Sequence, residues 1–220
     1  GIHAFVLSLL FSRKIKLVYF LTGLGPLGNW PWKPFYRLGL FLCSPTVHSV
    51  IVQNERDFRF VIHPKKALMR GSGYSAVVQR RLDYNRCVFA GRLMADKGAK
   101  ELFDFVERSR LQLEIYGSID LNDNLKRRLE SMVKNGLVEI HGYDINWNSK
   151  SNAGIALYPS KYNEGIPRFL IESLAAGRII VASNAAGCSD ILKIAGGISW
   201  NDYDFELVKA KSQDQDARIK

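Results

Sequence analysis

The stretch Glu164-Gly-Ile-Pro-Arg-Phe-Leu-Ile-Glu-Ser-Leu-Ala-Ala-Gly177 predicts a loop that runs directly into a helix. Pro167 suits the first helical position, because its φ is already helical and its missing amide proton would have no partner there. Gly177 is expected to close the helix. Apolar residues at helical spacing predict a buried stripe: Leu170, Ile171, Leu174 and Ala175.

Two carboxylates flank the start of this predicted helix. Glu164 lies in the loop, and Glu172 is expected to point away from the apolar stripe, which would leave both carboxylates free. First-turn amides and the helix dipole suit a phosphate or diphosphate, whereas carboxylates suit hydroxyl groups. The stretch therefore favours a sugar-nucleotide pocket. The alternative is an ordinary surface ion pair between Arg168 and Glu172, which are four residues apart.

The same residues resemble a known enzyme family. Glu164 and Glu172, followed by Ser-Leu-Ala-Ala-Gly, resemble the Glu-x7-Glu signature of retaining nucleotide-sugar glycosyltransferases of glycosyltransferase family 4, which have the GT-B fold. Two further segments fit that signature, Ile179-Ile-Val-Ala-Ser183 and Gly187-Cys188. The segment Phe89-Ala-Gly-Arg-Leu-Met-Ala-Asp-Lys-Gly98 resembles the Gly-Arg…Lys-Gly segment of the same family.

The resemblance implies transfer of a hexose-type sugar from a nucleoside-diphosphate donor, with UDP as the expected nucleotide, to an acceptor hydroxyl. It also implies retention of configuration at the anomeric carbon and a reaction without a metal or cofactor. It implies catalytic roles for Arg92, Lys97 and Glu164. The two cations would stabilise the leaving diphosphate, Glu164 would orient donor-sugar hydroxyls, and Glu172 would hold the ribose. The expected donor-binding residues are Gly23, Gly25, Arg92, Lys97, Gly117, Tyr143, Glu164, Gly165, Ile166, Pro167, Arg168 and Glu172.

Strands and helices alternate along the second half of the chain, which predicts a doubly wound, Rossmann-like parallel sheet. We expect a partial N-terminal Rossmann-like domain over residues 1–83 and a C-terminal donor-binding domain over residues 84–220. The polar, basic residues 75–85 are the expected linker. The resemblance covers the second domain almost completely but only the end of the first. We therefore expect the sequence to be a fragment that lacks most of the acceptor side.

Each expected ligand residue follows a predicted strand, as open parallel sheets require. Arg92 follows the first strand of the second domain, Gly117 the second, His141-Gly-Tyr143 the third and Lys161–Gly165 the fourth. Tyr143 would flank a nucleobase. In the first domain, the turn Thr22-Gly-Leu-Gly25 also ends a strand, and its glycines would let the backbone approach a phosphate. A plain glycine turn is the alternative.

The 31 Lys and Arg residues exceed the 21 Asp and Glu residues, which gives a net charge of +10 and fits an acidic partner. Basic and aromatic residues gather between Lys14 and Arg37, which favours contact with an anionic membrane surface. The alternative is a helix packed on the sheet through Leu38, Leu40 and Phe41. No nucleic-acid-binding motif is present, so we expect no nucleic-acid partner.

No run reaches the roughly 18 apolar residues that span a bilayer, and three scattered cysteines fit a reducing compartment. We therefore expect a cytoplasmic protein, peripheral to the inner face of the cell membrane. The expected acceptor is a polyprenol-linked or other saccharide, in envelope or capsular polysaccharide synthesis. A rival hypothesis is a non-catalytic α/β module that binds a nucleotide or another anion.

Overall fold

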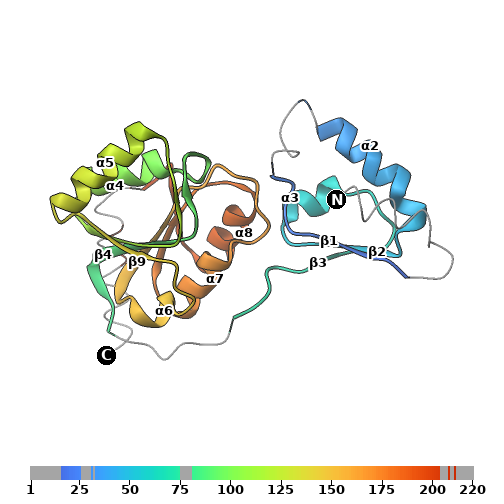
Figure 1. Cartoon of the computed structure of the whole chain (residues 1–220). Helices are drawn as coiled ribbons and strands as arrows, with labels where there is room; N and C mark the ends of the chain where they lie inside the picture. Colours follow the sequence, from blue (N-terminus) through green and yellow to red (C-terminus); the bar gives the residue numbers. More distant parts are fainter. Residues whose placement is uncertain are drawn as a thin grey trace.

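The computed structural model describes residues 16–25, 31, 33–74, 81–203, 208 and 211, which form two α/β units (Figure 1). The first unit contains a parallel sheet in the order β1-β2-β3. Its elements are β1 (Val18–Leu21), α2 (Lys33–Cys43), the short 3-10 helix η2 (Ser44–Thr46), β2 (Ser49–Val52), α3 (Glu55–Phe60) and β3 (Lys66–Leu68).

The second unit contains a six-stranded parallel sheet in the order β11-β10-β9-β4-β6-β8. Its strands are β4 (Asp83–Ala90), β6 (Gln112–Tyr116), β8 (Val138–Gly142), β9 (Ala153–Tyr158), β10 (Ile179–Ala182) and β11 (Ile198–Ser199), and β5 (Leu93–Met94) pairs separately with β7 (Ile119–Asp120). The predicted doubly wound parallel sheet is confirmed, and the strand order reverses between β4 and β9.

Helices cover both faces of this sheet (Figure 1). On one face lie α4 (Ala99–Ser109) and α5 (Asp123–Lys134), and on the other α6 (Trp147–Lys150), α7 (Arg168–Ala175) and α8 (Ala186–Ala195). The short 3-10 helix η3 (Ala95–Lys97) precedes α4. Every residue of β9 is buried, because a central strand covered on both faces needs apolar side chains in both directions. The core therefore lies between the sheet and its two helix layers.

The helix predicted from the opening stretch forms as α7, with a one-residue correction at its start. Pro167 has the expected helical φ of −62°, but its ψ of 122° is extended, so the first helical residue is Arg168. Pro167 is therefore the last residue of the loop and directly precedes the first residue of the helix. Gly177 ends the helix as predicted: its φ is +78°, and its amide donates to Leu174 O at 2.9 Å.

Several predicted features fall wholly or partly outside the described residues. They are an apolar segment at 4–11, the cations Arg13 and Lys14, the aromatic residues Trp30 and Trp32, much of the linker at 75–85, and the polar tail at 213–218. The strand β4 begins at Asp83, one residue before the predicted start of the second domain. Among the residues that are described, no helix is long and apolar enough to cross a membrane.

The two units meet where β1 ends and the loop before α7 begins. The Gly165 amide donates to Thr22 O at 2.6 Å, and the Gly25 amide donates to Asn163 O at 2.8 Å. A side chain from α3 adds a third bond, since Asn54 Nδ2 donates to the Glu164 carbonyl at 3.1 Å. The loop that carries Glu164 is therefore held by backbone contacts from the first unit.

Glycines make this close contact possible. A methyl group on Gly165 would lie 2.4 Å from Thr22 O, and one on Gly187 at the start of α8 would lie 1.3 Å from Gly165 O. Gly23 has a φ of +135° and faces the Gly165 amide from the other side. Side chains at these positions would push β1, the Glu164 loop and α8 apart, so the junction requires glycine.

We predict that Gly187→Ala lowers the free energy of unfolding by about 1 to 3 kcal/mol, because the added methyl group must displace the Gly165 backbone. The matched control is Gly39→Ala inside α2, where no atom lies within 4 Å of the added carbon. That control should raise the free energy by up to about 1 kcal/mol through helix propensity. Urea unfolding followed by tryptophan fluorescence measures both, and equal midpoints for the two variants would contradict the packing argument.

Candidate functional site

A cleft of about 370 Å³ opens at the carboxyl ends of β4, β6 and β8. It is lined by Ala90, Gly91, Arg92, Tyr116, Gly117, Ser118, Tyr143, Asp144, Ile145, Trp147, Arg168, Phe169 and Glu172. The predicted convergence at the strand ends thus brings together five expected residues: Arg92, Gly117, Tyr143, Arg168 and Glu172. A cleft of this size suits a small ligand.

Backbone contacts between neighbouring strand ends shape the floor of the cleft. The Gly91 amide donates to Tyr116 O at 2.8 Å, and the Gly117 amide donates to Gly142 O at 2.7 Å. Gly117 has a φ of +128°, and a methyl group there would lie 2.1 Å from Gly91 O. Gly117 is therefore required because two strand ends approach closely there. Its position at the cleft thus has a structural explanation.

Glu172 is buried and bound on both carboxylate oxygens, so the expectation that its carboxylate would stay free is wrong. Trp147 Nε1 donates to Oε2 at 2.7 Å, and Arg168 Nε donates to Oε1 at 2.6 Å. The ion pair between Arg168 and Glu172, which was the alternative expectation for these two residues, is therefore present. The residue is buried because α6 lies over this side of α7, where the Trp147 and Phe169 rings are 5.2 Å apart. A carboxylate oxygen has two lone pairs, so each can still accept from a ligand hydroxyl.

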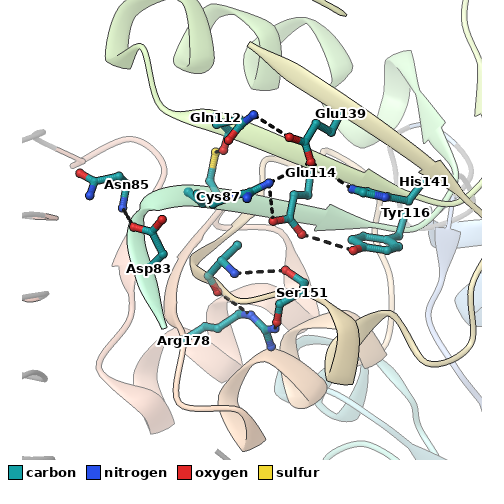
Figure 2. Close-up of polar contacts among 12 residues, drawn as sticks. Asp83, Asn85, Cys87, Gln112, Glu114, Tyr116, Glu139, His141, Ser151 and Arg178 are labelled. Carbon is teal, nitrogen blue, oxygen red and sulfur yellow. Dashed lines mark hydrogen bonds and ion pairs between the residues drawn. The ribbon is translucent and has the colours of Figure 1, made fainter. Parts of the chain in front are cut away.

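Arg178 holds the segment that carries Trp147. Its side chain is buried, and its guanidinium donates to the Ala153, Ser151 and Asn148 carbonyls at 2.8, 2.9 and 3.2 Å and also to Asn148 Oδ1. Figure 2 shows Arg178 reaching Ser151 below the sheet. Its guanidinium carbon lies 5.2 Å from the centre of the Trp147 ring.

Burial lowers the pKa of Arg178 to about 10, so the side chain is still charged at neutral pH. The sequence analysis missed this network. The available signal was an arginine directly before the fully apolar strand Ile179–Ala182, a position where a charged side chain needs buried partners.

A second polar network supports the floor of the cleft (Figure 2). The Tyr116 hydroxyl donates to Glu114 Oε2 at 3.3 Å, and Arg86 contacts Glu114 Oε1 at 3.0 Å. Burial and the adjacent Glu114 carboxylate raise the pKa of Tyr116 to about 12. The His141 ring, near the end of β8, stacks on Tyr116 with centroids 4.5 Å apart. Tyr116 therefore has a fixed ring at the cleft, and the sequence analysis did not identify it.

Lys97 and Glu164 form an ion pair outside this cleft. Lys97 Nζ lies 2.8 Å from Glu164 Oε1, and the side chains are 21% and 20% exposed. The Tyr158 hydroxyl donates to the same carboxylate oxygen at 2.8 Å and accepts from Lys97 Nζ at 3.2 Å. Burial and the neighbouring Glu164 raise the pKa of Tyr158 well above its usual range.

This triad corrects one expectation, because the Glu164 carboxylate is not free. Lys97 is not among the residues that line the cleft with Arg92, and its contact with a diphosphate stays a prediction. The position of Lys97 follows from the close approach of η3 to the end of β9: Gly98 has a φ of +81°, and a methyl group there would lie 2.4 Å from Pro159 O. This contact brings Lys97 to Tyr158, which the sequence analysis also missed.

The other expected residues lie in the contact between the two units. Gly23 lies close to the backbone of residues 163–165, and Gly25 lies close to the Tyr162 ring. Glycine is therefore needed at these two positions for packing. Their contact with a donor stays a prediction. The Gly165 amide is already used by Thr22 O. Ile166 and Pro167 are buried beside it.

Comparison with known proteins gives one family and several related folds. The family model for glycosyl transferases group 1 matches residues 74–211. No match is found among curated proteins. The chain is similar to the pneumococcal O-GlcNAc transferase GtfA in complex with UDP and GlcNAc, with 18% identity, a TM-score of 0.65, and coverage of 82% of this chain and 39% of that one.

Two further solved structures are similar over most of the chain. HepE of Anabaena in complex with UDP and glucose has 17% identity and a TM-score of 0.65, with coverage of 84% of this chain and 58% of that one. The UDP-forming α,α-trehalose-phosphate synthase of Burkholderia vietnamiensis has 13% identity and a TM-score of 0.61, with coverage of 86% and 59%. The predicted GT-B-like fold class is confirmed, and this chain spans between 39% and 59% of the lengths of the three structures.

We predict that a double-mutant cycle on Lys97→Met and Glu164→Gln gives a coupling energy of about 1 to 2 kcal/mol in the free energy of unfolding, because the pair is partly buried and shares the Tyr158 hydroxyl. The control is the pair of Lys161 and Glu101, whose lysine side chain is 66% exposed, so Lys161→Met and Glu101→Gln should couple by less than about 0.5 kcal/mol. Coupling no larger at Lys97 and Glu164 than at the control would show that the pair does not form in solution.

Proposed function

Because the chain belongs to the glycosyl transferases group 1 family, we propose that it takes part in transfer of a sugar from a nucleoside-diphosphate donor, with UDP as the nucleotide, to an acceptor hydroxyl with retention at the anomeric carbon. One observation carries the proposal. Two cations and a carboxylate, Arg92, Arg168 and Glu172, line one cleft at the carboxyl edge of a parallel sheet. This combination offers positive charge for a diphosphate and an acceptor for ribose hydroxyls.

On this proposal the nucleoside half of the donor occupies the cleft. Tyr143 is 84% exposed at its rim and offers an aromatic face to the base, while Glu172 is held in place by Trp147 and Arg168 for the ribose. Arg92 binds the diphosphate. The charge of Arg168 is partly satisfied by Glu172, so Arg92 is the stronger candidate for phosphate contact.

The sugar half is assigned to the triad of Lys97, Tyr158 and Glu164. As the anomeric C–O bond breaks, negative charge grows on the leaving diphosphate, and Arg92, Lys97 and the first-turn amides of α7 stabilise it. Glu164 orients donor-sugar hydroxyls. The acceptor oxygen forms its bond to the anomeric carbon on the face that the diphosphate leaves, and its proton passes to the departing oxygen. We propose that these cations make a metal unnecessary.

We propose a polyprenol-linked or other saccharide acceptor in envelope polysaccharide synthesis, and a site of action at the inner face of the cell membrane. The support is the exposed apolar side of α2, formed by Phe35, Leu38, Phe41 and Leu42. The alternative of a helix packed on the sheet holds for Leu40, which contacts the small core of the first unit. It does not hold for Leu38 and Phe41, which are more than half exposed. Arg37 on α2 and Lys16, two residues before β1, are exposed cations of the same unit.

We predict that isothermal titration shows UDP binding, and that Arg92→Ala weakens it at least tenfold, which corresponds to about 1.4 kcal/mol. The control Lys126→Ala removes an exposed cation from α5 and should leave the affinity unchanged. Glu172→Gln provides a second readout. Wild type should bind 2′-deoxy-UDP more weakly than UDP, and the variant should show a smaller difference. Identical UDP affinities for wild type and Arg92→Ala would contradict the assignment of the cleft.

A sugar-transfer assay distinguishes the proposed glycosyltransferase from the alternative, a non-catalytic module. Binding of UDP without sugar transfer, even by a longer form of the chain that includes a complete first domain, would support a non-catalytic nucleotide-binding module instead.

We predict that the combined variant Phe35→Ser, Leu38→Ser and Phe41→Ser sediments with phosphatidylglycerol vesicles at least tenfold more weakly than wild type, because the exposed apolar side of α2 is removed. The control variant Val133→Ser, Ile140→Ser and Ile194→Ser removes exposed apolar residues of the second unit. Wild-type binding should also fall as salt increases, since attraction to anionic lipid is screened. Equal sedimentation of both variants would contradict membrane contact through α2.

A further inference from the structure

A second hollow, of about 650 Å³, lies between the two units and shares no lining residue with the cleft. We call it the basic groove. It is bounded by α2 and α3 of the first unit and by α8 of the second, and α3 contacts α8 directly (Figure 1). Its lining residues are Pro34, Arg37, Glu55, Arg56, Arg59, Phe60, Ser189, Asp190 and Lys193.

The two carboxylates of the basic groove are already engaged. Asp190 is buried, and its Oδ2 accepts from the Glu55 backbone amide at 2.7 Å. The Glu55 carboxylate forms an ion pair with Arg70, which lies outside the groove. Neither acid forms an ion pair with a cation that lines the groove, and the four lining cations outnumber the two carboxylates.

Three cations of the groove have no carboxylate partner among the described residues. Arg37 comes from α2, Arg59 from α3 and Lys193 from α8, so each arrives on a different helix. Arg37 lies over the Phe60 ring at 6.0 Å, whereas Arg56 is engaged with Asn163 and with the Asn184 carbonyl. Like charges around one concave surface repel each other and concentrate a positive potential there.

The groove also adjoins the loop that carries Glu164. Arg56 Nη1 donates to Asn163 Oδ1 at 3.2 Å, and Asn54 at the start of α3 donates to the Glu164 carbonyl. A ligand in the groove would therefore lie beside the loop of the candidate site without entering the cleft.

We propose that the basic groove binds a phosphate-bearing ligand distinct from the nucleotide, held by Arg37, Arg59 and Lys193. Arginine and lysine together recognise phosphate through directed hydrogen bonds and charge. The phosphate is either a free anion or the headgroup of a lipid, and the chemistry of recognition is the same. The proposal does not depend on the assignment of the cleft.

The test compares two variants with the same change in charge. The groove variant is Arg37→Glu, Arg59→Glu and Lys193→Glu. The control variant is Lys126→Glu, Arg127→Glu and Lys134→Glu, three exposed cations of α5. Isothermal titration with inorganic pyrophosphate should show at least tenfold weaker binding to the groove variant than to the control variant. Any contribution of the cleft cancels, because both variants keep it intact.

Phosphatidylglycerol vesicles form the second arm of the test. Weaker binding of the groove variant to pyrophosphate identifies a free phosphate ligand. Weaker binding to vesicles alone identifies a lipid headgroup if the double variant Arg59→Glu and Lys193→Glu, which keeps Arg37 on α2, shows it as well. A loss that the double variant does not show belongs to membrane contact through α2 and overturns the proposal. Equal binding of both variants to both probes overturns the proposal. UDP affinity should be the same for the two variants, so a failure of the cleft assignment would be seen separately. If the groove variant does not fold, as judged by circular dichroism, the neutral variant Arg37→Gln, Arg59→Gln and Lys193→Gln replaces it.

Discussion

The backbone contact between Gly165 and its neighbours is the constraint on which the candidate site depends. Gly165 donates to Thr22 O on one side and lies against Gly187 on the other, with no room for a side chain at either glycine. Three segments distant in sequence are thereby brought together: the end of β1, the Glu164 loop and the start of α8. The backbone of the loop joins the two units together with side-chain contacts such as that of Arg56 with Asn163, so Glu164 and α7 have a fixed position relative to both.

Buried charge around the cleft is a second common feature. Glu172, Glu114 and Arg178 are each less than 10% exposed, and each is held by several hydrogen bonds or an ion pair. Such groups are costly to bury, so their partners must already be in place when the protein folds. The result is a cleft whose polar groups have little freedom to reorient, which is the condition for electrostatic stabilisation of a developing charge.

The sequence predicted the parallel sheet, the helix after Glu164 and the position of the cleft, because these follow from local periodicity and from the rule for strand ends. It did not predict the partners of the charged residues. Glu172 was expected to be free, because helical periodicity places it off the apolar stripe but cannot show that Trp147 covers that side. No local pattern indicates a role for Tyr158, because its contact with Lys97 depends on η3 approaching β9 at Gly98. Contacts of this kind arise between distant segments, and a single sequence carries no local signal for them.

The triad of Lys97, Tyr158 and Glu164 has a consequence for the proposed function, since a ligand that binds there must replace both charged partners. A ligand that offers only an anion would draw Lys97 away and leave Glu164 without its cation, and one that offers only hydroxyl groups would leave the existing pair undisturbed. A ligand that carries both an anion and hydroxyl groups can replace both partners together. On the proposed function, the pair would therefore favour a sugar phosphate over either the sugar or the phosphate alone, because each of these would leave one charge unpaired.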